Sequence, residues 1–279
     1  MKALLLAAGA GTRLGPLTAE QPKPMVEIGG EPGVAHALRW LRRHGVSDVV
    51  INLHHHPDVL RQFVGDGARY GVAVTYSLEP AILGTAGALR PLAGFFRGAA
   101  AFVVLYGDVL TDLDLAPVLQ AHQAAGADAT IVLTRVDDPT RAGIVGFDER
   151  RRVTRIVEKP AASEVFSEWA NAGIYVCGPR VLQYLSPEGP QDFARDLFPA
   201  MLRDGCHLLA SPTEALVIDF GSPQRLELAR RNAEVGTRNA EQGNAEGGTR
   251  NAEQGRPHRS AFALPPSGLG GEGAGGVPC

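Results

Sequence analysis

Cysteine and tryptophan are scarce in this chain of 279 residues, which contains three cysteines and two tryptophans. The cysteines are Cys177, Cys206 and Cys279, and their wide separation matches neither the close pairs of a metal site nor a disulfide framework. Such sparse usage is typical of proteins in a reducing compartment. We therefore expect the protein to be cytoplasmic.

Long apolar runs and an excess of basic residues are missing as well. No apolar stretch reaches the roughly 20 residues that a membrane-spanning helix needs. The short apolar run after Lys2 is interrupted by Gly9 and Gly11 too early for a secretory signal. The formal net charge is −3, whereas affinity for nucleic acid depends on clustered Lys and Arg. We therefore expect neither a membrane nor a nucleic acid as partner.

Apolar strands alternate with helical patterns over residues 1–232. Strand-like runs such as KALLLAA and DVVINL flank the segment GVAHALRWLRRHG, which has helical spacing. This alternation predicts an α/β fold with a Rossmann-like, mixed and mainly parallel sheet flanked by helices. In such sheets ligands bind beyond the carboxyl ends of the strands.

The second half of the sequence changes character. The segment IVGFDERRRVTRIVEKP predicts a β-hairpin and QDFARDLFPAMLRDG has a helical pattern, as TAGALRPLAGFF has in the first half. From residue 233 the chain nearly repeats Arg-Asn-Ala-Glu-x-Gly and then becomes rich in glycine and proline, with no apolar face to bury. We expect one folded domain over residues 1–232 and a disordered tail over 233–279, with an interaction segment as the alternative for the tail.

A glycine-rich loop, GAGTRLGPLTAEQPKPM, follows the first strand directly. The dinucleotide fingerprint and the P-loop both require a glycine at position 14, where Leu14 stands. The loop still has the chemistry of a phosphate cradle, because glycines allow close backbone approach and Arg13 presents a fork of donors. Pro22 and Pro24 stiffen the segment that carries Lys23. Since Lys23 stands at the end of a loop, we expect it to contribute little to the core.

Several polar residues next to strands have competing interpretations. His54, His55 and His56 suggest a metal site, but adjacent side chains converge poorly on one ion and no further ligand stands at a suitable spacing. We expect them to mark a strand end that leads into a helix. Asp112 and Asp114 are either additional metal ligands or helix-capping residues, and we expect Asp114 to be an N-cap.

An ordered series of motifs extends through most of residues 1–230. After the glycine-rich loop come LGTAGAL, YGDV, TDLDL, VEKP, NAGIYV and IDFGSP. This series resembles the sugar-1-phosphate nucleotidyltransferases, also called nucleotide-sugar pyrophosphorylases, and is most similar to their mannose-1-phosphate and heptose-1-phosphate guanylyltransferases. The resemblance implies a nucleotide-diphospho-sugar transferase fold in which the hairpin forms a small sugar-binding region. It also implies an enzyme whose substrates are a nucleoside triphosphate and a sugar 1-phosphate.

The resemblance assigns roles to particular residues. It implies that the catalytic residues are Arg13, Lys23 and Asp108. The implied nucleotide-binding residues are Leu6, Ala8, Gly9, Gly11, Thr12, Glu79, Gly84, Thr85 and Gly87. The implied sugar-phosphate-binding residues are Gly143, Glu158, Lys159 and Asn171. The implied cofactor is Mg²⁺, with Asp108 and Asp219 as its ligands.

The identity of the product stays open at this point. GTP and mannose 1-phosphate, giving GDP-mannose, are the substrates that the resemblance favours. Alternatives are GDP-heptose, UDP-N-acetylmuramate, and dTDP- or UDP-glucose, because enzymes that make these share the motifs. A catalytically silent, nucleotide-sugar-binding subunit is a further alternative, and the spacing of the glycines argues against a nicotinamide oxidoreductase. The sequence leaves open whether the protein is a monomer or a homodimer.

Overall fold

The computed structural model describes residues 1–233. These residues belong to one unit, Met1–Val235. Apart from Ala233, the tail for which we expect disorder lies outside the described residues. Within the described part of the chain, no helix has both the length and the apolar character needed to cross a bilayer.

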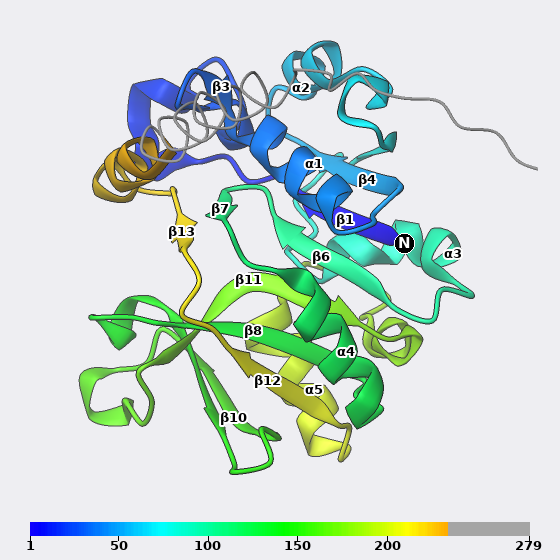
Figure 1. Cartoon of the computed structure of the whole chain (residues 1–279), viewed down its shortest axis with the longest axis vertical. Coiled ribbons are helices and arrows are strands. Elements are labelled where there is room, and N and C mark those ends of the chain that lie inside the picture. The colour runs from blue at the N-terminus through cyan, green and yellow to red at the C-terminus, as the bar shows by residue number, and fades with distance from the viewer. Residues whose placement is uncertain (234–279) are drawn as a thin grey trace, which may run out of the picture. The chain divides into compact units, whose positions relative to one another are not determined.

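Nine strands form one mixed sheet (Figure 1). Its strands are β1 (Lys2–Leu6), β4 (Asp48–Leu53), β5 (Ala73–Leu78), β6 (Phe102–Tyr106), β8 (Ala129–Arg135), β9 (Gly143–Phe147), β10 (Val153–Glu158), β11 (Trp169–Cys177) and β12 (Leu208–Pro212). Strands β5, β4, β1 and β6 run parallel, and β11 then pairs antiparallel with β6. Strands β9 and β10 form the predicted hairpin. Two short ladders pair β2 (Glu27–Ile28) with β3 (Glu31–Pro32), and β7 (Val109–Thr111) with β13 (Val217–Asp219).

Helices cover both faces of this sheet. The α-helices are α1 (Gly33–Arg43), α2 (Pro57–Val64), α3 (Ala93–Phe96), α4 (Leu115–Ala125) and α5 (Phe198–Arg203), and residues from 223 to 233 are helical too. Helices α1, α2 and α4 bury apolar side chains against one face, as the spacing of Val34, Leu38 and Leu41 predicts. Helices α3 and α5 cover the other face. The predicted α/β fold, with a mixed sheet between helices, is confirmed.

Two predicted helices differ in form from a regular α-helix. Residues Gly87–Leu92 form a 3₁₀ helix before α3, since the ring of Pro91 would clash with the carbonyl group of Gly87 in a regular α-helix. Residues Phe193–Leu197 form a π-helical turn that continues into α5. Strand β12, whose five residues pair in parallel with β8, was not predicted from the sequence.

The register of the parallel strands brings several loops to one edge of the sheet. Leu6 at the end of β1 lies opposite Asn52 of β4 and Tyr106 of β6. These three strands therefore end at nearly the same level of the sheet. The loops that follow β1, β4 and β6 therefore begin side by side, at the edge where ligands are expected.

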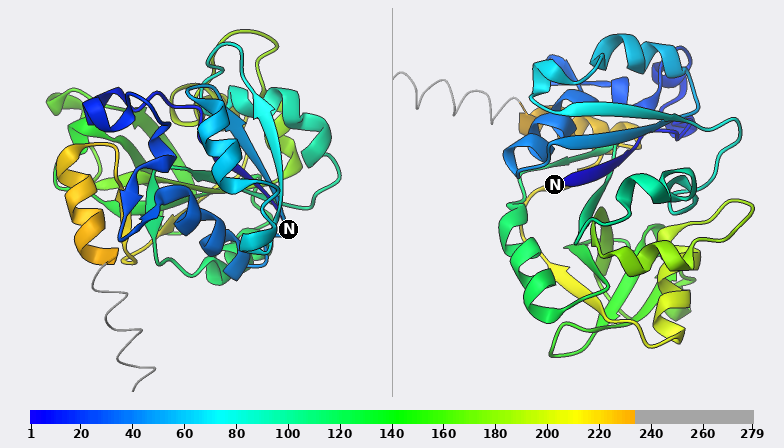
Figure 2. Two further views of the ribbon diagram at one scale, coloured as in Figure 1. Left: turned by 90° about the horizontal axis from the view of Figure 1, so that it is seen from above. Right: turned by 90° about the vertical axis from the view of Figure 1, so that its right-hand side faces the viewer.

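A small apolar cluster packs the end of the described chain against the loop after β1. Phe220 is 1% exposed and lies in this cluster with Leu14 and Leu226. A Cβ added to Gly33 would lie 2.5 Å from the Phe220 ring, so α1 starts directly against it. Figures 1 and 2 show the final helix, coloured orange, beside the dark blue loop that follows β1.

We expect Phe220→Ala to lower the free energy of unfolding by about 3–4 kcal/mol, because it empties a fully packed aromatic site. Urea denaturation followed by circular dichroism measures the change. Phe166→Ala is the matched control, since the Phe166 side chain is 37% exposed. Equal losses of stability in the two variants would contradict the packing role of Phe220.

Candidate functional site

Three charged side chains from distant parts of the chain meet beyond the end of β6. The Nζ atom of Lys23 forms an ion pair with Asp108 Oδ2 and lies 3.4 Å from Asp219 Oδ1. Asp108 comes two residues after β6, and Asp219 ends β13. The short β7–β13 ladder pairs Asp219 with Val109, the residue after Asp108, and Phe220 N donates to Asp108 O at 2.9 Å. The inferred convergence of Asp108 and Asp219 is thus present in the fold.

Gly221 makes room for this cluster, and the sequence analysis did not single it out as a site residue. A Cβ added at this position would lie 2.7 Å from Asp219 Oδ1 and 2.9 Å from Arg13 Nη2, and it would also overlap Lys23 Nζ. The side chains of Arg13, Lys23 and Asp219 therefore share the space in front of one glycine. The motif IDFGSP, which contains Gly221, was the available signal.

The electrostatics of the two carboxyl groups differ. Burial and the neighbouring Asp219 raise the pKa of Asp108 above its ordinary value, against the opposing effect of Lys23. Burial also acts to raise the pKa of Asp219, but Lys23, the Gly221 N–H, Arg13 and Arg225 together hold it below its ordinary value. The cationic side chains thus stabilise the charged form of Asp219.

Lys23 differs from the expectation that it contributes little to the core. It is 7% exposed, and its ammonium group is the shared partner of two carboxylates. Removing that charge leaves two acidic groups close together and partly buried, which is unfavourable. We therefore expect the loss of Lys23 to lower the stability of the fold.

The glycine-rich loop after β1 carries the first group of predicted nucleotide-binding residues. Gly11 has a φ of 64°, and a Cβ there would lie 2.9 Å from Thr18 Cγ2, so this position needs glycine. Gly9 has open space around its Cα. Thr12 and Arg13 are exposed, whereas Ala8 is 6% exposed. Leu6 ends β1 and accepts a hydrogen bond from Gly107 N at 2.8 Å.

Glu79 is connected to that loop through a buried amide. Ala7 N donates to Asn52 Oδ1 at 2.6 Å, and Asn52 Nδ2 donates to Glu79 Oε1 at 2.8 Å. Leu83 N donates to Glu79 Oε2 at 3.0 Å. Asn52 was not among the predicted site residues, although a polar residue inside the apolar run DVVINL was a usable signal.

The second glycine cluster packs against a segment that precedes the π-helical turn. Gly84 has a φ of 79°, and a Cβ there would lie 2.5 Å from Gln191 O. The backbone N–H groups of Ala86 and Gly87 donate to the same oxygen at 2.9 Å. Thr85 Oγ1 donates to Asp192 Oδ1 and accepts from Phe193 N, both at 3.0 Å, so Thr85 is tied across the fold to the start of the π-helical turn.

Three of the four predicted sugar-phosphate-binding residues lie together at the end of the hairpin. Gly143 starts β9 opposite Glu158, which ends β10, and a Cβ on Gly143 would lie 2.5 Å from Glu158 Oε2. The Lys159 side chain is 62% exposed and its Nζ lies 3.9 Å from Glu158 Oε1. Lys159 is therefore free to meet an anion.

Asn171, the fourth residue, belongs to a chain of hydrogen bonds below the sheet edge. Its Nδ2 atom donates to Tyr175 Oη at 2.6 Å, and Tyr175 Oη donates to Tyr106 Oη at 3.2 Å. Burial raises the pKa of Tyr106 to about 12 and that of Tyr175 well above its ordinary value. Both phenols are therefore neutral donors at physiological pH.

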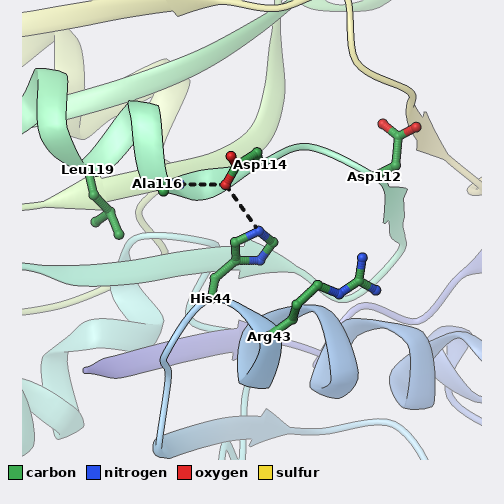
Figure 3. Close-up of a pocket in the computed structure, with 6 residues that line it drawn as sticks. All are labelled: Arg43, His44, Asp112, Asp114, Ala116 and Leu119. Atoms are coloured by element: carbon green, nitrogen blue, oxygen red, sulfur yellow. Dashed lines mark hydrogen bonds and ion pairs between the residues drawn. The ribbon is translucent and has the colours of Figure 1, made fainter. Parts of the chain in front are cut away.

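Asp112 and Asp114 do not join the cluster at Asp108. Asp114 caps α4 by accepting from Ala116 N at 3.0 Å, as predicted, and Asp112 accepts from Leu216 N at 2.8 Å. Both line a hollow of about 460 Å³ between α1 and α4. Figure 3 shows its lining residues, which are Arg43, His44, Asp112, Asp114, Ala116 and Leu119. None of the predicted site residues is among them.

We expect Gly221→Ala to lower kcat by about 100-fold, because the new methyl group displaces reacting groups by an ångström or more. The fold should persist, since Gly221 is not in the left-handed region. Steady-state kinetics and thermal unfolding test both statements. Gly94→Ala is the matched control, because a Cβ at Gly94 meets nothing within 4 Å. Unchanged kcat in Gly221→Ala would contradict the crowding described above.

Comparison with known proteins gives matches along nearly all of the described chain. The family model for nucleotidyl transferases matches residues 2–234. A UTP–glucose-1-phosphate uridylyltransferase of Synechocystis sp. is 36% identical over 235 residues, covering 79% of this chain and 60% of the relative. A mannose-1-phosphate guanyltransferase of Schizosaccharomyces pombe is 36% identical over 228 residues, covering 80% and 62%. The chain thus spans about three fifths of the length of these curated relatives.

A similar backbone occurs among solved structures. The crystal structure of HddC from Yersinia pseudotuberculosis complexed with GMP-PN is 28% identical to this chain, with a TM-score of 0.70. The match covers 83% of this chain and 98% of that chain. The backbone agreement confirms the nucleotide-diphospho-sugar transferase fold that the motif series implied. Together with the family match over residues 2–234, it shows that the chain belongs to the nucleotidyl transferase family.

Proposed function

We propose that the chain transfers a nucleotidyl group from a nucleoside triphosphate to a sugar 1-phosphate, which releases pyrophosphate and forms a nucleotide-sugar. One observation carries the proposal: two cationic and two acidic side chains converge where the parallel strands end. These side chains are Arg13, Lys23, Asp108 and Asp219. Two polyanionic substrates can react only where their charge is neutralised and their phosphates are aligned.

The reaction needs no covalent bond to the protein. An oxygen of the sugar phosphate forms a bond to the α-phosphorus, and the bond between that phosphorus and the bridging oxygen breaks. The electron pair leaves with pyrophosphate. Arg13 and Lys23 would bind the phosphate oxygens and stabilise the negative charge that develops on them.

The donor set fits a divalent cation. Within residues 1–233 no three His, Cys, Asp or Glu side chains are grouped as metal ligands, so the protein offers the pair Asp108 and Asp219. Lys23 Nζ lies between these carboxylates, and the attraction of a cation to this place supports the proposal. Mg²⁺ is commonly held by one or two carboxylates together with substrate phosphates. When bound, Mg²⁺ would neutralise charge on the triphosphate.

The two halves of the site would divide the substrates between them. The nucleotide side would consist of the loop after β1 and the segment that carries Glu79, Gly84, Thr85 and Gly87. The sugar side would consist of Gly143, Glu158, Lys159 and Asn171. The carboxylate of Glu158 would accept hydrogen bonds from sugar hydroxyls, while Lys159 would bind the sugar phosphate.

GTP with mannose 1-phosphate is the pair that we propose first, on the strength of the motif series. Sequence identity does not indicate whether the base is guanine or uracil, because the uridylyltransferase and the guanyltransferase above are both 36% identical to this chain. A catalytically silent subunit is a weaker proposal, since Arg13, Lys23, Asp108 and Asp219 are all retained.

Pyrophosphate release by the full chain with Mg²⁺ tests the proposal. The assay crosses GTP, UTP, dTTP, CTP and ATP with the 1-phosphates of mannose, glucose, heptose and N-acetylmuramate. We expect release with at least one pair, and highest kcat/KM with GTP and mannose 1-phosphate. Release with a different pair would correct the substrate and keep the reaction. Nucleotide binding without release from any pair would favour the silent subunit.

We expect Lys23→Met to bind Mn²⁺ about tenfold more tightly than the wild type without nucleotide, a change of about 1.4 kcal/mol. The reason is that Lys23 competes with the ion for Asp108 and Asp219. Electron paramagnetic resonance of free Mn²⁺ measures the affinity, and turnover should fall in the same variant. Lys159→Met is the control, because Lys159 forms its ion pair with Glu158 and not with Asp108 or Asp219. Unchanged or weaker Mn²⁺ binding in Lys23→Met would contradict the competition.

A further inference from the structure

The three adjacent histidines after β4 have no role in the chemistry described so far. We propose that His55 and His56 are positioning residues, which hold the GTR loop (residues 9–21) in place at the nucleotide side of the site. This inference rests on the proposed function, because it assigns those histidines to the binding of the nucleoside triphosphate. It extends the function to residues that touch neither substrate.

Both histidines form hydrogen bonds with backbone carbonyl groups of the GTR loop. His55 Nε2 lies 3.0 Å from Thr18 O, and His56 Nε2 lies 2.8 Å from Ala19 O. A carbonyl oxygen can only accept, so each Nε2 atom carries the proton. The imidazole donates this bond in its neutral and in its cationic form.

The GTR loop has no other hydrogen bonds to the rest of residues 1–233. Thr18 Oγ1 donates to Gly11 O, Ala19 N donates to Pro16 O, and Gln21 Nε2 donates to Leu17 O, all within the loop. Leu14 and Thr18 are buried, so packing holds one side of the loop. Within residues 1–233, His55 and His56 therefore make the hydrogen bonds that connect the loop to the remaining fold, and Arg13 adds an electrostatic attraction to Asp219.

The backbone of His56 is set by these contacts. Its φ of 44° lies in the left-handed region, which is unfavourable for a side chain with a Cβ, and Pro57 follows it. Such a conformation persists where surrounding contacts over-determine it. The two rings also meet edge to face, with centroids 4.2 Å apart, which fixes their relative orientation.

The histidine segment also contacts Glu79, which belongs to the second segment on the nucleotide side. His54 Nδ1 lies 2.7 Å from Glu79 O, and Asn52 joins Ala7 N to the Glu79 carboxylate. Residues 52–56 therefore contact both loops that form the nucleotide side. This arrangement sets the distance between them, and it also excludes a shared metal site, because the three rings are directed at different carbonyl groups.

Loss of the two histidine hydrogen bonds should weaken the binding of the nucleotide more than that of the sugar phosphate. Arg13 lies in the GTR loop and is exposed, whereas Lys23 lies beyond the loop and is held by Asp108 and Asp219. Loss of the two hydrogen bonds releases the loop that carries Arg13 and leaves the sugar side unchanged. A small displacement of a positioning group costs affinity for the ligand it orients.

The test is the double variant His55→Ala/His56→Ala in the full chain. We expect KM for the nucleoside triphosphate to rise about tenfold, while KM for the sugar 1-phosphate stays within about twofold. Hydrogen exchange of residues 9–21, measured by mass spectrometry without substrates, should be faster than in the wild type. Exchange elsewhere in the sheet should not change.

A rescue variant separates positioning from general stability. In His55→Gln/His56→Gln the carboxamide N–H groups can still donate to Thr18 O and Ala19 O, so we expect KM and hydrogen exchange to return towards wild type. His44→Ala is the matched control, because His44 Nδ1 lies 2.9 Å from the carbonyl of Trp40 at the end of α1. It removes one bond of the same kind far from the GTR loop.

The outcomes distinguish this inference from the function on which it rests. Wild-type turnover together with unchanged KM and exchange in the double alanine variant would overturn the positioning role. The role would also be overturned if His44→Ala raised KM for the nucleotide equally. If no substrate pair gave turnover in the wild type, the proposed function would fail, and exchange in the GTR loop would still decide whether the histidines hold it.

Discussion

The site depends on one shared ion pair, in which the ammonium group of Lys23 lies between Asp108 and Asp219. The two carboxylates are 85 and 196 residues away from Lys23 in the sequence. Without this cation the two carboxylates would repel each other in a partly buried place, and one of them would be protonated more readily. The loop after β1, the end of β6 and strand β13 are therefore held in one arrangement by charge as well as by packing.

Two further networks link the nucleotide half of the fold with its sugar half. Thr85 is bonded to Asp192, which directly precedes the π-helical turn, and that turn packs against the hairpin. Asn171, Tyr175 and Tyr106 form a second chain of hydrogen bonds, between β11 and β6. Both networks are buried or partly buried. Hydrogen bonds are stronger there than in water, and breaking one would leave a polar group without a partner. The segment that carries Thr85 and the hairpin are thus connected through hydrogen bonds and packing.

Much of this fold could be predicted from the sequence, because apolar periodicity reports burial directly. DVVINL and GVAHALRWLRRHG predicted β4 and α1 closely. The form of the segment around Pro91 and strand β12 could not be predicted as well, since a proline changes local hydrogen bonding and a five-residue strand leaves little periodicity. The motif series located Arg13, Lys23, Asp108 and Asp219, but Gly221 and the histidine contacts depend on distances that only the folded chain provides.

The cluster around Phe220 has a consequence for how the protein is made. The GTR loop is synthesised about two hundred residues before Asp219, Phe220 and the helix that follows them. Until then Lys23 lacks one of its two carboxylates and Leu14 lacks its apolar neighbours. Contacts between such distant residues form late and slow folding. Strands β1, β4, β5 and β6 can therefore pair before Asp219 is available to complete the charged cluster.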